Sequence, residues 1–184
     1  MRLTDQPRKV YWDACVWISL IMGETSRIHN CVFIIDEAKK GRIEIWTSSL
    51  THAEAFKMKC GQDQKGIQAD KDKAFEDYLE QEFVVEVAVD HDIGVLARTL
   101  LRKHCPPLKK PNDAIHLATA ILHNVDELHT SDRDDLLNLD GHIQRKDGKT
   151  LKICNVPNPP PVSQQHDLLT ELTQTDETSQ EKQS

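Results

Sequence analysis

Four acidic residues, from four separate parts of the sequence, are placed so that they can meet at one site. Each follows a predicted strand or lies in the first turns of a predicted helix; they are Asp13, Glu54, Asp113 and Asp132. In a parallel α/β sheet the carboxyl ends of the strands share one edge, and ligands bind outside that edge. We therefore expect the four carboxylates to lie together there.

Such a cluster predicts a metal site. Carboxylates gathered without a basic partner repel one another, which raises their pKa values and destabilises the fold unless cations or protons intervene. Hard oxygen ligands, with neither thiolates nor paired histidines, favour Mg²⁺ or Mn²⁺. Two such ions, roughly 3.5 to 4 Å apart, can activate water and stabilise the leaving oxygen of a phosphodiester. The acidic set thus predicts metal-dependent phosphodiester hydrolysis.

Each acid also has a structural interpretation. Asp13 and Asp132 are suited to cap the helices that follow them. Glu54 stands three residues after Thr51, which is the spacing of a capping box. Asp113 is a favourable first-turn acid for the dipole of its helix. A structural role would suffice for any one of them, but the convergence of four acids on one sheet edge favours a functional site.

The elements that would position these acids alternate between strands and helices. Short, partly apolar runs predict strands, at 10–12, 43–47, 83–87, 127–130 and 151–154, and the first three of these are rich in β-branched and aromatic residues. Helical spacing of apolar residues, together with capping signals, predicts helices at 16–22, 26–40, 50–59, 72–81, 91–104 and 112–123. The alternation predicts an α/β fold, a three-layer α/β/α sandwich with a mainly parallel central sheet.

The chain of 184 residues is long enough for one globular domain with a sizeable core. After a run of prolines the composition shifts to Gln, Thr, Ser and Glu, so we predict a domain at 1–157 and a polar, flexible tail at 158–184. The tail carries four of the seven net negative charges, which leaves three on the domain. Two bound divalent cations would neutralise these, so net charge neither excludes nor supports a nucleic-acid substrate.

Composition also indicates where the protein acts. No apolar run approaches the roughly 20 residues that cross a bilayer, and the first residues lack the apolar core of a secretory signal. The five cysteines are scattered without a Cys-x-x-Cys pair, which fits reduced thiols. We expect a cytoplasmic protein that does not enter a membrane. A mixed site such as His52 with Cys60 is a less favoured alternative.

Four segments of the sequence together resemble the PIN domain and, within it, the VapC-type toxins. They begin at Val10, Ser48, Asn112 and Leu128 and read VYWDACV, SSLTHAE, NDAIHLATA and LHTSD. The most specific part is the combination of DAIHLATA with a TSD that follows after one strand. The resemblance covers residues 8–156.

The resemblance implies a PIN-like fold and an endoribonuclease that depends on Mg²⁺ or Mn²⁺ and cuts single-stranded or loop RNA. It also implies a homodimer that a small antitoxin protein silences. By position, the family's acidic quartet corresponds to Asp13, Glu54, Asp113 and Asp132. Asp135 would be an auxiliary metal ligand, while Asp134 is expected to face solvent.

Two further residues in these segments bear on the site. Cys15 stands where the family usually has Ser, Thr or Asn, and a thiol is a poorer hydrogen-bond partner for a carboxylate or a metal-bound water. This departure would make the site less efficient. His116 is expected to be a packed, hydrogen-bonded helix residue rather than a ligand.

Basic residues near the predicted site are candidates for contacts to substrate phosphates. The favoured ones are Lys57 and Lys59, after Glu54, and Lys109 and Lys110, before Asp113. Weaker candidates further away are Lys65, Lys71, Lys73, Arg102 and Lys103.

Two other functions stay open. A phosphatase of the haloacid dehalogenase type also places an aspartate after its first strand, but it needs a second acid two residues later, where this chain has Cys15. A catalytically silent PIN-like module that binds RNA or a protein partner is consistent with Cys15 and with the acidic balance.

Overall fold

The central sheet has five parallel strands in the order β3-β2-β1-β4-β5, in a computed structural model that describes residues 6–55 and 69–160. The strands are β1 (Arg8–Trp12), β2 (Ile43–Ser48), β3 (Val84–Val87), β4 (Glu127–His129) and β5 (Lys152–Cys154). The middle strand is β1, whose Val10 pairs with Ile45 of β2 and with Glu127 of β4. The predicted parallel sheet is confirmed.

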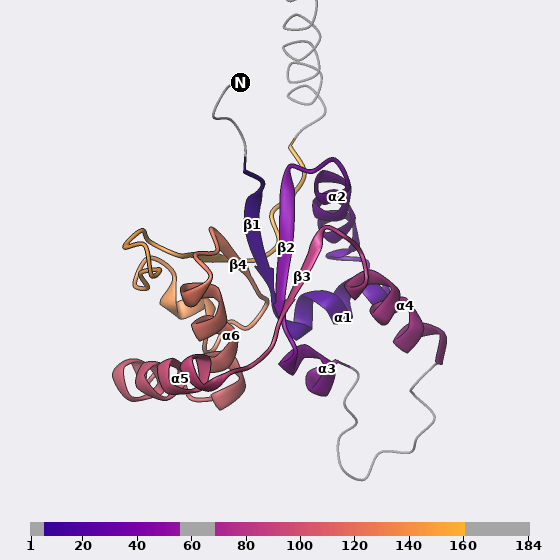
Figure 1. Ribbon diagram of the computed structural model, residues 1–184. Helices are drawn as coiled ribbons and strands as arrows, with labels where there is room; N and C mark the ends of the chain where they lie inside the picture. Colours follow the sequence, from indigo (N-terminus) through magenta and orange to yellow (C-terminus); the bar gives the residue numbers. More distant parts are fainter. Residues whose placement is uncertain (1–5, 56–68, 161–184) are drawn as a thin grey trace, which may run out of the picture.

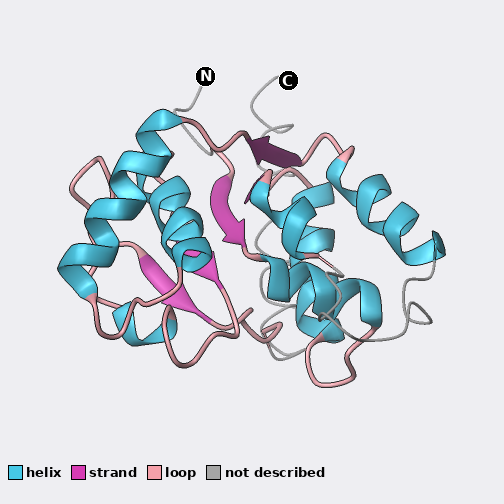
Figure 2. Cartoon of the chain, turned by 90° about the horizontal axis from the view of Figure 1, so that it is seen from below, coloured by secondary structure: helices cyan, strands magenta, loops and turns pink. Residues whose placement is uncertain are grey.

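Helices cover both faces of this sheet (Figures 1 and 2). One face carries α1 (Ala14–Met22), α2 (Ile28–Lys39) and α4 (Ala69–Leu79), and the other carries α5 (His91–His104) and α6 (Pro111–Leu122). The short helix α3 (Leu50–Glu54) follows β2 at the lower edge of the sheet in Figure 1, where β1 also runs into α1. The predicted α/β/α sandwich is therefore confirmed. A 3-10 turn, η1 (Leu137–Leu139), precedes β5.

Most predicted boundaries lie within a few residues of the observed ones, and α3 is the exception. We predicted this helix at 50–59, but it ends at Glu54 because Ala55 adopts an extended backbone with ψ of 127°. Residues 56–59 lie outside the described residues, as does the tail from 161 onward. Among the helices that the structure describes, none is long and apolar enough to cross a bilayer.

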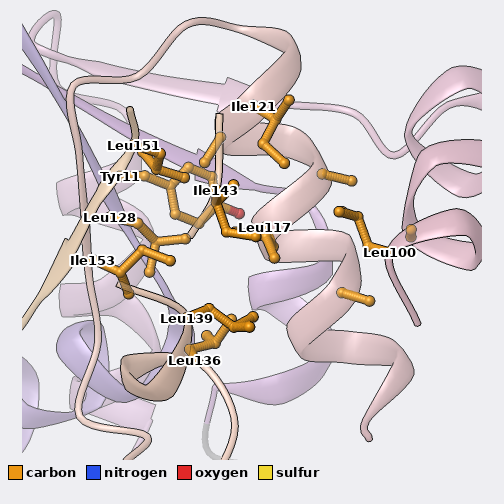
Figure 3. Packing of buried hydrophobic residues seen from close by; sticks show 14 of the residues in the cluster. Tyr11, Leu100, Leu117, Ile121, Leu128, Leu136, Leu139, Ile143, Leu151 and Ile153 are labelled. Atoms are coloured by element: carbon orange, nitrogen blue, oxygen red, sulfur yellow. The ribbon is translucent and has the colours of Figure 1, made fainter. Parts of the chain in front are cut away.

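The alternation of side chains along β1 links two hydrophobic cores. Val10 and Trp12 belong to the core under α1 and α2, whereas Tyr11 belongs to the core under α6. Trp12 packs edge to face against Trp17 of α1, with ring centroids 4.8 Å apart. Figure 3 shows the second core, in which aliphatic side chains of α6, β4 and β5 surround Tyr11.

Helix α6 provides a rigid support for the acids near its first turn. Pro111 occupies its first position, as predicted. Seven of its residues are buried because the helix packs on both the sheet and α5; they are Ala114, His116, Leu117, Ala118, Thr119, Ala120 and Ile121.

A buried polar network fixes β4 just before the loop that carries Asp132. The indole of Trp12 donates to Nδ1 of His129 (3.1 Å), so the proton of the neutral imidazole lies on Nε2 and is donated to Glu127 (2.9 Å). The other oxygen of Glu127 accepts from Arg8 (3.2 Å) and Lys152 (3.1 Å). The hydrogen bond from His129, followed by these cations, lowers the pKa of Glu127 to about 2.

This network predicts an acid-dependent loss of stability. The folded-state pKa of Glu127 is depressed from 4.5 to about 2, so its stabilising effect is present above pH 4.5 and is lost as the pH falls toward 2. Between pH 6 and pH 3 we expect the free energy of unfolding of the wild type to fall by about 2 kcal/mol more than that of Glu127→Gln. Urea unfolding measures both. Glu80→Gln, at an exposed position, is the control, and acid losses in Glu127→Gln as large as in the control would contradict the prediction.

Candidate functional site

The carboxyl edge of the sheet holds a hollow of about 200 Å³ into which all four predicted acids project. It is lined by Asp13, Ala14, Cys15, Ile18, Glu54, Asp113, His116 and Asp132. The structure thus brings together residues that lie up to about 120 positions apart in the sequence. The roles assigned to these acids stay predictions, and their individual environments define what each can do.

Asp13 combines a structural role with a free oxygen. It is the N-cap of α1, and its Oδ1 accepts from the amide of Val16 (3.2 Å) and from the thiol of Cys15 (2.7 Å). Its Oδ2 accepts no hydrogen bond from residues 6–55 or 69–160. The capping interpretation and the site interpretation therefore apply to different oxygens of the same carboxylate.

Cys15 joins Asp13 to the loop that follows β4. Its thiol donates to Asp13, while its sulfur accepts from the amide (3.1 Å) and the hydroxyl (2.9 Å) of Ser131. Burial, reinforced by the neighbouring Asp13 carboxylate, raises the pKa of the thiol to about 12, so Cys15 stays protonated and keeps its donor. It therefore makes the contact that a hydroxyl would make at this position.

Glu54 is held by two side chains of α6. Its Oε1 accepts from Nδ2 of Asn112 and its Oε2 lies against Nε2 of His116, both at 2.6 Å. On the other side of the imidazole, Nδ1 lies 2.7 Å from the hydroxyl of Tyr11. Because an ionised carboxylate can only accept, Nε2 carries a proton, and a neutral His116 then accepts from Tyr11 at Nδ1.

His116 was predicted to be packed and hydrogen-bonded, and at 1% exposure it is. The prediction missed that its ring also borders the hollow and orients Glu54. A sequence signal existed, since Asn112 and His116 are four residues apart and therefore project from the same face of α6.

Three carboxylates form a close group at one side of the hollow. Oxygens of Asp113, Asp132 and Asp135 all lie within 4.8 Å of one another. Oδ2 of Asp113 and Oδ2 of Asp135 are buried and have no hydrogen-bond partner within the described part of the chain. Burial, together with Asp135 and Asp132, raises the pKa of Asp113 to about 6. Buried carboxylate oxygens of this kind are stabilised by a nearby cation or by a proton, and the ammonium of Lys110 lies 3.3 Å from Oδ2 of Asp113 and 3.5 Å from Oδ2 of Asp135.

Asp132 divides its two oxygens in the same way as Asp13. Oδ1 accepts from the amides of Asp134 and Asp135, both at 2.9 Å, and so fixes the turn after β4. Oδ2 accepts from Nζ of Lys110 at 2.6 Å. Burial by itself would raise the pKa of Asp132, but the hydrogen bonds from Lys110 and from the two amides lower it. Asp134 is exposed, whereas Asp135 is buried, with only 1% of its surface exposed.

Lys110 supplies positive charge to this group. Its Nζ lies 2.6 Å from Asp132, 3.3 Å from Asp113 and 3.5 Å from Asp135, and the hydrogen bond to Asp132 raises the pKa of Lys110. The phosphate contact that we predicted for this lysine stays a prediction, and in this structure its ammonium lies among the acids. Its side chain is 57% exposed, so it can leave toward solvent when another cation or a phosphate arrives.

The remaining substrate candidates are less informative. Lys109 is exposed next to Lys110. Lys57 and Lys59 lie outside the described residues, and so does Cys60 of the alternative mixed site. His52, the other member of that alternative, contacts Glu86 at 3.2 Å.

The residues present fit a hard divalent cation. The group offers carboxylate oxygens from Asp113, Asp132 and Asp135, whose cation in this structure is the ammonium of Lys110, on a side chain that is 57% exposed. Asp13 and Glu54 border the adjacent hollow. Neither a thiolate nor an unoccupied imidazole nitrogen competes with them, because Cys15 is protonated and both nitrogens of His116 are bonded. Such a donor set favours Mg²⁺ or Mn²⁺ over softer metals.

Comparison with known proteins agrees with this architecture. The family model of the PIN domain matches residues 10–141. The chain belongs to the PIN-domain family. This membership replaces the haloacid dehalogenase alternative, whose chemistry would need a second acid at the position of Cys15. Nuclease activity is the class of function found in the family.

Two solved structures share the fold of this PIN domain. One is Mycobacterium tuberculosis VapC20, a sarcin-ricin loop cleaving toxin, with a TM-score of 0.52 and 16% identity over 68% of this chain and 91% of that one. The other is VapBC2 from Rickettsia felis bound to a DNA fragment from its promoter, with a TM-score of 0.54 and 15% identity over 81% of this chain and 99% of that one. A comparison with curated protein sequences gives no significant match.

The electrostatics of the acidic group generate a stability prediction. A bound Mn²⁺ at 100 times its Kd should raise the melting temperature of the wild type by roughly 5 to 10 °C. Asp113→Asn should lose most of this gain, yet in chelator it should melt no lower than the wild type, because it removes one of the mutually repelling carboxylates. Thermal unfolding with and without Mn²⁺ measures both effects. The exposed Asp134→Asn is the matched control, and an undiminished Mn²⁺ effect in Asp113→Asn would exclude the metal site.

Proposed function

We propose that this PIN-domain protein is an endoribonuclease that depends on Mg²⁺ or Mn²⁺ and hydrolyses phosphodiester bonds of RNA. The observation that carries the proposal is a pair of buried carboxylate oxygens, on Asp113 and Asp135, that accept no hydrogen bond from the described residues and lie 3.3 and 3.5 Å from the ammonium of Lys110. They lie beside a hollow bordered by Asp13, Glu54, Asp113 and Asp132. Family membership supports the same reaction class.

The acidic residues would bind metal ions from two sides of the hollow. Asp113, Asp132 and Asp135 would hold one cation on the side of α6 and the loop after β4, while Asp13 and Glu54 face the remaining space. When bound, the cations would supply an activated water and neutralise charge on the leaving oxygen. The protein fixes the carboxylates beforehand, Asp13 through the first turn of α1 and Asp132 through its own turn.

The orientation of Glu54 depends on a chain of two hydrogen bonds that starts at Tyr11 in the hydrophobic core. Tyr11 is buried under α6 and fixes the orientation of the His116 ring, which in turn presents Nε2–H to Glu54. We assign Tyr11 and His116 as positioning residues. Outer hydrogen bonds of this kind stabilise one orientation of a ligating side chain and increase its basicity.

The proposal extends to partners and location. The likeness to VapC20 and VapBC2 supports a role as the toxin of a toxin–antitoxin pair, with a small antitoxin as partner. A homodimer, a cytoplasmic location and the division into a nuclease domain at 1–157 and a tail at 158–184 belong to the same proposal.

The decisive experiment joins metal binding to cleavage. We expect calorimetry to show Mn²⁺ or Mg²⁺ binding to the wild type, and we expect a single-stranded RNA to be cut only when the metal is present. Asp13→Asn and Asp113→Asn should each reduce the cleavage rate by at least about 100-fold, the scale on which loss of one electrostatic group at a reacting centre acts. Asp134→Asn, an exposed acid of the same loop, should cleave like the wild type.

Two results would overturn the proposal. Binding of neither ion to the wild type would remove the basis for the metal site and would favour the catalytically silent module. Cleavage that persists equally in Asp13→Asn, Asp113→Asn and Asp134→Asn would show that the activity comes from a contaminant or from another site.

The hydrogen bonds from Tyr11 through His116 to Glu54 generate a separate prediction. His116→Ala should weaken Mn²⁺ binding and slow cleavage by about 10- to 100-fold, because Glu54 loses its orienting donor. His116→Gln should recover part of both, since its amide can donate from nearly the position of Nε2, and Tyr11→Phe should show a smaller loss. The exposed His142→Gln is the control. Equal Mn²⁺ affinity in all four variants would limit His116 to a packing role.

A further inference from the structure

A second and larger hollow lies next to the acidic one. It encloses about 550 Å³, within the range of roughly 300 to 1,000 Å³ that is usual for small-ligand sites. Its walls come from α1, α2, the loop after β4 and the segment after β5. The two hollows share Cys15, and the consecutive residues Ser131, Asp132 and Arg133 alternate between them.

The charge of this hollow is opposite to that of its neighbour. Among the described residues, its charged lining is Arg27 and Arg133 and includes no acid, although the whole chain has a net charge of -7. Within residues 6–55 and 69–160, the guanidinium of Arg133 makes no ion pair or hydrogen bond. Arg27 bonds Glu24 at 3.3 Å and Ser19 at 3.2 Å through one nitrogen, which leaves its other donors free. The hollow therefore favours an anion.

The rest of the lining offers neutral polar edges above an apolar floor. Nδ2 of Asn30 donates to the carbonyl of Val156 (3.0 Å) and to Asn158 (2.9 Å), which fixes the amide and leaves its oxygen as an acceptor. The amide of Asn155 has no hydrogen bond to the described residues and is exposed to the hollow. Cys31 and Val156 are buried beneath them. Amides beside apolar surface are suited to the edges and face of a nucleobase.

We propose that this second hollow binds one nucleotide of the RNA strand, directly adjacent to the phosphodiester that lies at the acidic hollow. Arg133 and Arg27 would contact the phosphate, and the asparagine amides would contact the base. Because Asp132 and Arg133 are consecutive, with Cα atoms about 3.8 Å apart, the two hollows are neighbours and one strand can reach both. The inference rests on the proposed function, which supplies the polynucleotide, but it concerns binding rather than cleavage.

A protein partner fits this lining less well. An acidic peptide would pair with Arg27 and Arg133, and its backbone amides could bond Asn30 and Asn155, but Asp and Glu side chains bring no flat aromatic face for the apolar surface of Cys31 and Val156. A nucleotide satisfies both halves of the lining at once, and so it is the occupant that the observations favour.

The test measures RNA affinity separately from cleavage. Binding of a labelled single-stranded RNA to the full chain is followed by fluorescence anisotropy in chelator, where no metal-dependent cutting occurs. Arg133→Ala should raise the Kd by about tenfold, the effect of one lost charge-assisted contact. Ser26→Trp, at the exposed rim of the hollow, keeps the charge but fills the space and should raise the Kd similarly. Arg98→Ala, exposed on α5, is the control for general charge loss and should bind like the wild type.

Cleavage by the same variants with Mn²⁺ separates the two proposals. For Arg133→Ala and Ser26→Trp we expect KM to rise as Kd does, with kcat changed by less than about twofold. If both variants bind and cleave RNA like Arg98→Ala, the nucleotide site is wrong and the nuclease stands. If RNA binding depends on the hollow but no cleavage occurs, the nuclease is wrong and the nucleotide site stands.

Two further outcomes overturn the nucleotide site. A wild type that neither binds nor cuts RNA contradicts both proposals. Binding of a synthetic acidic peptide that Arg133→Ala and Ser26→Trp abolish, alongside RNA binding that they leave intact, would assign the hollow to a protein partner.

Discussion

Repulsion among carboxylates is the constraint on which the rest of this structure depends. A parallel sheet with β1 at its centre brings Asp13 and Asp132 to the same edge, and α6 adds Asp113 beside them. Partial burial makes this repulsion costly. The molecule offsets it by bonding one oxygen of Asp13 and one of Asp132 to backbone amides and by placing the ammonium of Lys110 against the group. Two buried oxygens, on Asp113 and Asp135, accept no hydrogen bond from the described residues and lie 3.3 and 3.5 Å from that ammonium, so a divalent cation would stabilise the fold most at this point.

The hydrophobic core and the polar site are joined through β1. Its successive side chains alternate between the two faces, so Trp12 supports β4 through His129 while Tyr11 supports α6 through His116. Both contacts end at elements that carry acids, β4 before Asp132 and α6 beside Glu54. The position of the carboxylates is therefore determined by packing in two cores rather than by the loops alone.

Sequence reasoning reached the sheet, its helices and the convergence of the four acids, because these follow from short-range signals. Predicted strands end just before Asp13 and Asp132, and Pro111 marks the start of α6. Contacts across the fold were not predicted. The proximity of Lys110 to three acids depends on where the loop before α6 lies, and the hollow beside Arg133 exists only because the segments after β4 and β5 meet α2. The early end of α3 was not predicted either, because neither a proline nor a glycine follows Glu54 directly in the sequence.

The division of labour between the two oxygens of Asp13, and again of Asp132, limits which amino acids these positions can hold. The carboxyl group has to stay one methylene from the main chain to accept from amides two or three residues ahead. Glutamate would preserve the charge but lift the oxygen away from those amides, and asparagine would preserve the cap but lose the charge. Serine would keep neither the second oxygen nor the charge. At each strand end, aspartate is therefore the residue that has both the side-chain length needed to reach the amides and the negative charge. Glu54 has to span from α3 to α6, which needs the longer side chain of glutamate.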